Sequence, residues 1–228
     1  SLVFQEDLRP EDDLVDEGSA QAQPGGGGRV DTQYTTVAFE GAIINRLFYS
    51  VFGTFQSGRT LSYVEDDDST TGFTYRYRPI FAGAGGTGLR YYMPQTLSSR
   101  TGFNVTFGTG DDDHLSVVEG NTSGPSNLFV PISGSTHGHV FQAGLGNNVA
   151  LHAYYSMKPL ENAASRLVRD LQVGLDAFTF IRLVEGPVPA DGVRPAGEGN
   201  YLGSEIDASI NYRPFSDLGI SLVGGILL

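Results

Sequence analysis

The sequence contains no cysteine and no tryptophan, two methionines and a single lysine, Lys158. Without cysteine the chain forms no disulfide, which fits an oxidising cell envelope as well as a cytosolic compartment. No apolar run reaches about 18 residues, so no helix is expected to span a bilayer. Residues 1–6 lack the basic start and the long apolar stretch of a signal peptide. We therefore expect either that a leader has been removed or that the chain begins partway through a longer protein.

Basic residues are scarce: 14 Lys and Arg stand against 26 Asp and Glu, which gives a net charge of -12. This balance argues against a nucleic-acid partner, because phosphate binding needs clustered cations. It is compatible with cationic solutes, divalent metals or a lipopolysaccharide layer crosslinked by such metals. The 31 Gly, 14 Phe and 11 Tyr suit strands and turns better than helices. We predict an all-β chain that forms one domain over residues 1–228.

Aromatic and polar side chains alternate through residues 73–78, with aromatics at the odd positions and threonine or arginine at the even positions. Successive side chains of a strand point to opposite faces, so this segment has one aromatic and one basic face. The same alternation predicts further strands, within residues 1–5, 34–44, 47–56, 89–93, 103–107, 149–157, 171–182, 202–213 and 218–228. We expect about ten strands of membrane-crossing length, and we expect the chain to stop inside a strand.

Long polar stretches separate some of these strands. Residues 6–32 are acidic and then glycine-rich, and residues 109–139 form a second long polar stretch. Neither can bury enough apolar surface to order itself, so both are predicted to be solvated loops. Their alternation with short turns is typical of a transmembrane β-barrel.

A soluble β-sandwich also alternates apolar and polar residues, so the alternation does not by itself decide the fold. Three details favour an antiparallel transmembrane β-barrel. The polar faces are rich in small residues and carry charges of both signs, as a wet lumen requires. Aromatics such as Tyr49, Tyr91, Tyr155 and Tyr212 lie near strand ends, where interfacial girdles form. With a single lysine, an open sheet would also have few of the residues that protect exposed edges.

Two segments resemble the outer-membrane alginate export family. One is Leu-Arg-Tyr-Tyr-Met-Pro at residues 89–94 followed by Thr-Phe-Gly-Thr-Gly-Asp-Asp-Asp at residues 106–113, which is similar to the family's strand, turn, strand and acidic loop. The other is Tyr-Leu-Gly-Ser-Glu-Ile-Asp at residues 201–207, close to the carboxyl end. The resemblance implies a bacterial outer-membrane barrel that conducts an anionic polysaccharide through an arginine-lined pore. The chain is short for that family and lacks a terminal aromatic strand, so we expect a fragment or one part of a larger barrel.

Charged residues on the predicted polar faces are the candidate lumen residues. They are Arg76, Arg78, Arg90, Arg182, Arg213, Glu40, Asp176, Glu205 and Asp207. Arg76, Arg78 and Arg90 are expected to form an anion-selecting patch, because rings of arginine set the selectivity of pores. The alternative is that these arginines pair with the four carboxylates and merely fill the interior.

Two acidic runs, at residues 65–68 and 111–113, offer the clustered carboxylates that calcium prefers. Asp111, Asp112 and Asp113 are therefore a candidate calcium site, although such charge runs are more often solvated loops. An EF-hand is excluded by spacing. We otherwise expect no cofactor.

Three further motifs point to no catalytic chemistry. Gly83, Gly85 and Gly88 have dinucleotide-motif spacing, but the next residues resemble a strand rather than the helix that such a site needs. His137 and His139 have no third zinc ligand at a suitable spacing. Glu205 and Asp207 lie on one strand face without any feature of a glycosidase pair. The chain is not expected to be an enzyme.

The sequence thus favours a porin-like channel for small solutes or an anionic polysaccharide, with lipid, lipopolysaccharide and further protein chains as partners. A surface protein anchored by a barrel is one alternative. A soluble, calcium-tolerant β-sandwich binding module is the other.

Overall fold

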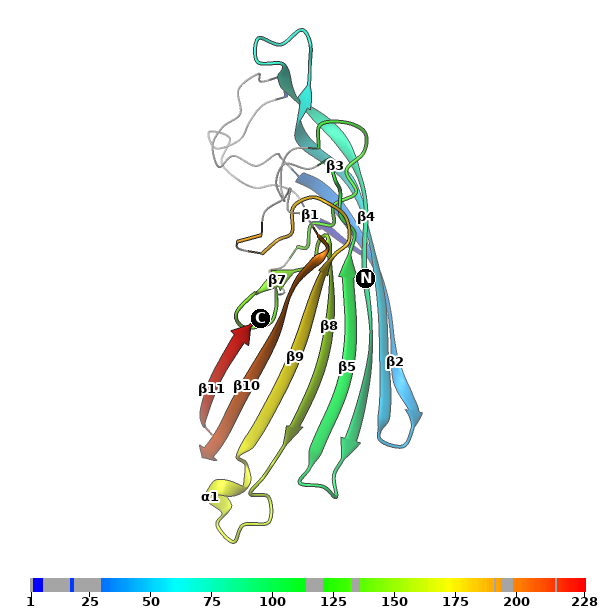
Figure 1. Cartoon of the computed structure of the whole chain (residues 1–228). Helices are drawn as coiled ribbons and strands as arrows, with labels where there is room; N and C mark the ends of the chain where they lie inside the picture. The colour runs from blue at the N-terminus through cyan, green and yellow to red at the C-terminus, as the bar shows by residue number, and fades with distance from the viewer. Residues whose placement is uncertain are drawn as a thin grey trace.

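The structure is a computed structural model that describes residues 2–5, 17–18, 30–113, 121–132, 136–190, 192–193, 199–215 and 217–228. The described chain is dominated by long, curved strands (Figure 1). The elements are β1 (Leu2–Gln5), β2 (Val30–Ile44), β3 (Leu47–Glu65), β4 (Phe73–Met93), β5 (Ser99–Gly108), β6 (Thr136–His137), β7 (Ala143–Gly144), β8 (Asn148–Met157), α1 (Arg166–Arg169), β9 (Gln172–Arg182), β10 (Tyr201–Phe215) and β11 (Leu218–Leu227).

One antiparallel sheet of nine strands organises the molecule, in the order β1-β2-β3-β4-β5-β8-β9-β10-β11. Strands that follow one another in the chain lie side by side, and β6 and β7 form a separate small sheet within the β5–β8 connection. The prediction of an all-β fold is confirmed, with α1 as one short helical turn. The expected closed barrel is not formed by the described residues, because β1 and β11 are the two edges of an open sheet.

Strands β3 and β4 are much longer than the sequence pattern indicated. The separate strands expected at residues 73–78 and 89–93 are the two ends of β4, which runs straight through the glycine-rich stretch at residues 83–88. Glycine is tolerated here because β3 and β5 pair with β4 on both sides of this stretch. A Cβ on Gly86 would lie 2.6 Å from the Phe52 ring, so glycine also makes room for that side chain.

The connections alternate in length, as predicted. A two-residue turn at residues 45–46 joins β2 to β3, and it is at the same end of the sheet as residues 94–98 and 158–171 and as the junction of β10 with β11. The long connections, residues 109–147 and 183–200, are at the opposite end (Figure 1). The predicted loop 6–32 ends earlier than expected because β2 begins at Val30, and residues 6–16 and 19–29 lie outside the described part of the chain. The predicted loop 109–139 contains β6.

The convex face of the sheet is covered with exposed apolar side chains. They come from every long strand and include Val37, Phe39, Ile43, Val51, Phe55, Phe81, Leu89, Tyr91, Phe103, Phe107, Tyr155, Leu175, Ile206, Ile210, Ile220, Leu222 and Ile226. The register places these residues on one face, because for example Leu89 lies opposite Phe103 and Leu175 lies opposite Tyr155. Within the described residues no second sheet packs against this face, as a sandwich would require.

The concave face carries polar and small side chains in the same register. One row across neighbouring strands consists of Glu40, Ser50, Gly88, Asn104, His152, Phe178 and Glu205. The face assignments predicted for β2 and β9, and for β10 from Glu205 onward, are confirmed by the register. Leu202 was predicted on the outward face, but it packs against Phe141 and Phe180 on the concave side, because the register of β10 shifts between Tyr201 and Gly203.

The pattern at residues 73–78 was interpreted wrongly as part of the exposed apolar face. Tyr75 is fully buried and packs with Leu61, Tyr63 and Tyr77. There β3 and β4 extend beyond the residues of β2 and β5 that pair with them, as a two-stranded ribbon. Such ribbons twist strongly, so their faces need not continue those of the sheet. Leu175 is 52 % exposed and does not share an interior with Tyr75.

No helix among the described residues is long and apolar enough to cross a membrane.

Candidate functional site

The concave face carries a cluster of arginines and aromatic rings near the short-turn end of the sheet, which we call the arginine–aromatic cluster: Phe48 on β3, Arg90 and Tyr92 on β4, Arg100 on β5 and Tyr154 on β8. The Arg90 guanidinium carbon lies 5.8 Å from the centre of the Phe48 ring and 5.4 Å from that of Tyr92. These distances are typical of cation–π contacts. Among the described residues, neither Arg90 nor Arg100 forms an ion pair, so their charges are available to a solute.

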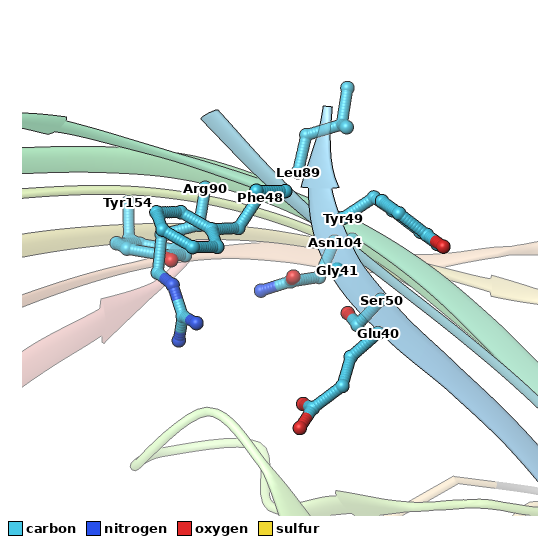
Figure 2. A pocket seen from close by; sticks show the side chains of 11 residues that line it. Glu40, Gly41, Phe48, Tyr49, Ser50, Leu89, Arg90, Asn104 and Tyr154 are labelled. Atoms are coloured by element: carbon cyan, nitrogen blue, oxygen red, sulfur yellow. The ribbon is translucent and has the colours of Figure 1, made fainter. Parts of the chain in front are cut away.

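A hollow of about 560 Å³ lies beside this cluster. Figure 2 shows Glu40, Ser50 and Asn104 on the same side of the ribbon as the Arg90 guanidinium, whereas Leu89 and Tyr49 point away. Glycines shape this wall. A Cβ on Gly102 would lie 2.5 Å from the Tyr154 ring, so the tyrosine can lie across β5 because residue 102 has no side chain. The hollow therefore combines one cation, a carboxylate, an amide and flat aromatic surfaces.

The other half of the concave face carries Asp176 on β9 and Glu205 and Asp207 on β10. Asp176 Oδ1 lies 2.7 Å from Nε2 of His152, and the other ring nitrogen of His152 lies 3.3 Å from the Asn104 amide nitrogen. Because an amide nitrogen only donates, Nδ1 of His152 is the acceptor and Nε2–H donates to Asp176. The His152 ring also stacks on Phe178 at 4.2 Å between centroids. Asp176 is thus held by the His152 ring within the wall.

Two parts of the β5–β8 connection, residues 121–132 and 136–147, fold onto the concave face. We call them together the inward segment. Its first part contacts β2 to β4: the Tyr34 hydroxyl donates to the Val130 carbonyl at 2.6 Å, and the Val130 N–H donates to Gln56 Oε1 at 3.0 Å. Phe129 packs there against Tyr34, Ile80 and two alanines of β4. This contact attaches the segment to one side of the sheet.

The second part is attached to β10 by one carboxylate. Glu205 is fully buried and accepts the backbone N–H groups of His139, Val140 and Phe141 at 2.6, 2.7 and 2.9 Å. Three consecutive N–H donors converging on one anion form a strong, charge-assisted contact. Phe141 packs beside it against Phe180, with ring centroids 4.9 Å apart. The predicted lumen residue Glu205 therefore holds a loop in place instead of facing an open path.

Gly138 is required by this contact. Its φ of +80° is in the left-handed region, and an added Cβ would lie 2.5 Å from the Glu205 carboxylate. The flanking His137 donates from Nδ1 to the Ala143 carbonyl at 3.3 Å and accepts from the Thr106 hydroxyl at 3.0 Å through Nε2. Burial lowers the pKa of His137 below its ordinary value. The neutral ring therefore fits both bonds.

The other predicted arginines are dispersed. Arg76 lies in the extended ribbon and pairs with Asp66 at 2.8 Å, and Arg78 donates to the Thr122 carbonyl at 3.4 Å. Fourteen strand positions separate Arg76 from Arg90, which is about 45 Å at 3.3 Å per residue. The structure does not bring the three predicted arginines together. It also does not pair any of them, within the described residues, with the four predicted carboxylates.

Arg182 and Arg213 are at opposite ends of the sheet. Arg182 is buried at the end of β9, opposite Asn148, and Arg213 is exposed on β10 near the short turns. There the hydrogen bond and charge of Lys158, 2.9 Å away, lower the pKa of Asp170, and Arg213 adds a smaller effect in the same direction. Neither arginine faces the hollow.

The candidate calcium residues are occupied by protein donors. Asp111 is buried and accepts the Asn127 N–H at 2.7 Å and the Asn121 amide at 3.2 Å. Burial raises the pKa of Asp113, but hydrogen bonds from Thr122 and Ser123 outweigh this and lower the pKa below its ordinary value. Such bonds fix the loop without a metal. Among the described residues, no group of three or more His, Asp or Glu has the arrangement of a metal site, and calcium binding by Asp111, Asp112 and Asp113 stays a prediction.

Sequence reasoning missed Arg100, Phe48 and Tyr154 as parts of the site. Arg100 was detectable, because the alternation that places Asn104 and Thr106 on the polar face extends back to residue 100. Phe48 and Tyr154 could not be detected, because an aromatic residue on a polar face interrupts the alternation and looks like the end of the pattern. No protein-family model matches the chain, and no curated protein is significantly similar to it. The resemblance to the alginate export family therefore stays a prediction.

Proposed function

We propose that this chain forms part of the wall of a bacterial outer-membrane channel. Its convex face contacts lipid and its concave face lines a water-filled path for small polar solutes. The observation that carries the proposal is the separation of faces: exposed apolar side chains on one side of eight long strands, polar and small ones on the other. A folded soluble protein rarely exposes so large a continuous apolar surface. Transmembrane barrels need it on every strand.

The arginine–aromatic cluster is the proposed selectivity element of the channel. Arg90 and Glu40 line the hollow, and Arg100 lies close to Tyr154, another lining residue, so two cations stand against one carboxylate there. On the other half of the face, Asp176 and Glu205 are hydrogen-bonded by His152 and by backbone N–H groups. The local field therefore favours anions, although the chain is acidic overall. An anionic polysaccharide is the solute that the family resemblance suggests, and a small carboxylate would meet the same groups.

Two measurements test the proposal. The purified chain should require detergent to stay monodisperse, and reconstitution in planar bilayers should give a conductance with anion preference. Replacing both Arg90 and Arg100 with serine should lower the anion-to-cation permeability ratio at least severalfold, whereas Arg59→Ser, an exposed arginine paired with Asp31, should leave it unchanged. A chain that is monodisperse without detergent would refute the membrane assignment.

The inward segment supports one second candidate. Because it is attached to both sides of the concave face, the same wall is compatible with a closed barrel that anchors surface loops and conducts nothing. Bilayers that contain the folded chain but show no conductance, even after the contact at Glu205 is removed, would favour this anchor.

A further inference from the structure

Two opposite charges line the hollow beside the arginine–aromatic cluster, and they do not pair. Arg90 on β4 and Glu40 on β2 both line it, and Figure 2 shows their head groups on the same side of the ribbon. Among the described residues, neither side chain forms an ion pair. Glu40 lies opposite Ser50, which lies opposite Gly88, and Arg90 follows Gly88 by two residues. Two strand spacings and two residues along the strand therefore put about 12 Å between the Cα atoms of the two charged residues.

Aromatic rings hold the cation on its side of the hollow. The Arg90 guanidinium makes cation–π contacts with the rings of Phe48 and Tyr92, which restrain its position. A guanidinium and a carboxylate that face one hollow from different strands create an electric field across it. Such a field orients a solute that carries both a positive and a negative group. The hollow therefore fits a dipolar solute better than a simple anion.

Three oxygen atoms on the Glu40 side form a set of acceptors. The Asn104 amide nitrogen is engaged by Nδ1 of His152 at 3.3 Å, so the amide oxygen Oδ1 is directed elsewhere. A Cβ on Gly88 would clash with this Oδ1 and would lie 2.9 Å from the Ser50 hydroxyl oxygen, so both oxygens lie over the glycine. The Glu40 carboxylate lines the same hollow. A primary ammonium group has three N–H donors and no acceptor, whereas a hydroxyl has one donor, so this set of oxygens suits an ammonium group.

The opposite side of the hollow suits a carboxylate and an apolar group. The planar guanidinium of Arg90 matches the two oxygens of a carboxylate. The rings of Phe48 and Tyr154 also line the hollow and offer flat apolar surface. The volume of about 560 Å³ is within the range of small-molecule sites, about 300–1,000 Å³.

We propose that this hollow binds an amino acid in its zwitterionic form. The ammonium group of the amino acid donates to the three oxygens, its carboxylate accepts from Arg90, and its side chain lies against the two rings. Glu40 is thereby the residue that distinguishes a zwitterion from a simple anion. As a step in the passage of solutes along the wall, the site rests on the proposed channel function. As a binding site, it depends only on the residues of the hollow.

Fluorine NMR on the full chain in detergent micelles tests the site, with empty micelles as the blank. The probe is para-fluorophenylalanine, whose signal broadens on binding. Its N-acetyl derivative lacks the positive charge, its carboxamide lacks the negative charge, and the corresponding hydroxy acid replaces the ammonium group with a hydroxyl. The variants are Glu40→Gln and Arg90→Gln. Matched controls are Glu65→Gln, at the exposed end of β3, and Arg59→Gln, whose arginine pairs with Asp31.

The unaltered chain should bind the zwitterion at least severalfold more tightly than each of the three analogues. Glu40→Gln should weaken binding of the zwitterion severalfold and leave the acetylated probe unaffected. Arg90→Gln should weaken both of these probes and leave the carboxamide unaffected, and the two controls should change nothing. The proposal is overturned if the unaltered chain binds the zwitterion no better than the acetylated probe or the hydroxy acid, if Glu40→Gln weakens the zwitterion and the acetylated probe equally, or if no probe binds. The comparison of probes on the unaltered chain needs no variant to fold.

Planar-bilayer conductance of the same preparation separates this inference from the proposed function. Selective binding of the zwitterion by a chain that carries no current would refute the channel but not the site. A current through a chain that does not distinguish the probes would refute the site but not the channel.

Discussion

The two halves of the concave face accommodate their charged side chains in different ways. In the β3–β5 half, Arg90 is exposed, stacks on aromatic rings and borders a hollow of about 560 Å³. In the β8–β10 half, Glu205 is fully buried and accepts three backbone N–H groups of the inward segment. A polar wall residue needs either water or a hydrogen-bond donor. The first half leaves its charges to solvent or solute, and the second uses its charge to hold a loop.

Removing the carboxylate at position 205 should give the largest change in this comparison. Glu205→Ala leaves the N–H groups of Val140 and Phe141 without an acceptor, whereas the His139 N–H keeps Asp207 Oδ2 at 3.2 Å. The substitution should lower the free energy of opening of residues 136–147 by about 2–4 kcal/mol. Hydrogen exchange at the amides of residues 139–141 measures this opening. Glu205→Gln, which keeps an acceptor but loses the charge, should have an intermediate effect, and Glu40→Ala in the open half should have none. Unchanged protection in Glu205→Ala would show that other contacts hold the segment.

Truncating the aromatic ring that packs beneath the loop should give the next largest effect. Phe141 is buried against Phe180, so Phe141→Ala leaves a cavity and should destabilise the segment by about 3 kcal/mol. Phe48→Ala, in the open half, should cost about 1 kcal/mol or less, because a half-exposed ring loses less buried surface. Denaturant titration in detergent compares the two variants. Equal losses would mean that the halves are packed alike.

Adding a methyl group at position 102 tests how tightly the β3–β5 half is packed. Gly102→Ala places a Cβ against the Tyr154 ring and should reduce the free energy of unfolding by about 1–2 kcal/mol, as overpacking does. Gly53→Ala is the matched control, since nothing lies within 4 Å of a Cβ there. The anion preference of reconstituted channels should fall in the first variant only. If Gly102→Ala matches Gly53→Ala in both measurements, neither stability nor anion preference depends on the position of the Tyr154 ring across β5.

A change of pH should have the smallest effect, and it should change only the attachment of the inward segment to the β8–β10 half. Because burial lowers the pKa of His137, the detached segment binds a proton more readily than the attached one. Stability of the attachment is therefore complete above the ordinary histidine pKa of about 6.5 and is lost as pH falls from there through the lowered value. Hydrogen exchange at residues 139–141 between pH 8 and pH 5 reports this loss. His137→Asn should remove the pH dependence, and a dependence that persists would assign it to another group.

Alternation along the chain was sufficient to predict which residues share a face. Glu40, Asp176, Glu205 and Asp207 all lie on the predicted polar face, because a strand has a period of two wherever it runs. The same rule grouped Arg76 and Arg78 with Arg90. The rule could not predict how far apart these arginines lie along β4. A glycine-rich stretch between them is typical of a turn in the sequence, and only its pairing with β3 and β5 shows that it is a strand.

The inward segment shows a different limit. Residues 109–139 carry no period and were predicted to be a solvated loop, yet Phe129 is buried on the wall, and so is Phe141 just beyond this range. Short apolar runs of this kind gain their partners from strands far away in the sequence. The backbone N–H groups that bind Glu205 are invisible to any reading of side chains, because every residue other than proline has one.

The sequence by itself determined the all-β class, the two-faced strands and the alternation of short and long connections, because all three follow from local steric rules and from the sequence distance between strands. The tertiary structure decided how the described strands pair, that the arginines disperse and that one carboxylate holds a loop. Those outcomes depend on register, twist and the packing of distant segments, which are properties of pairs of strands rather than of any one of them.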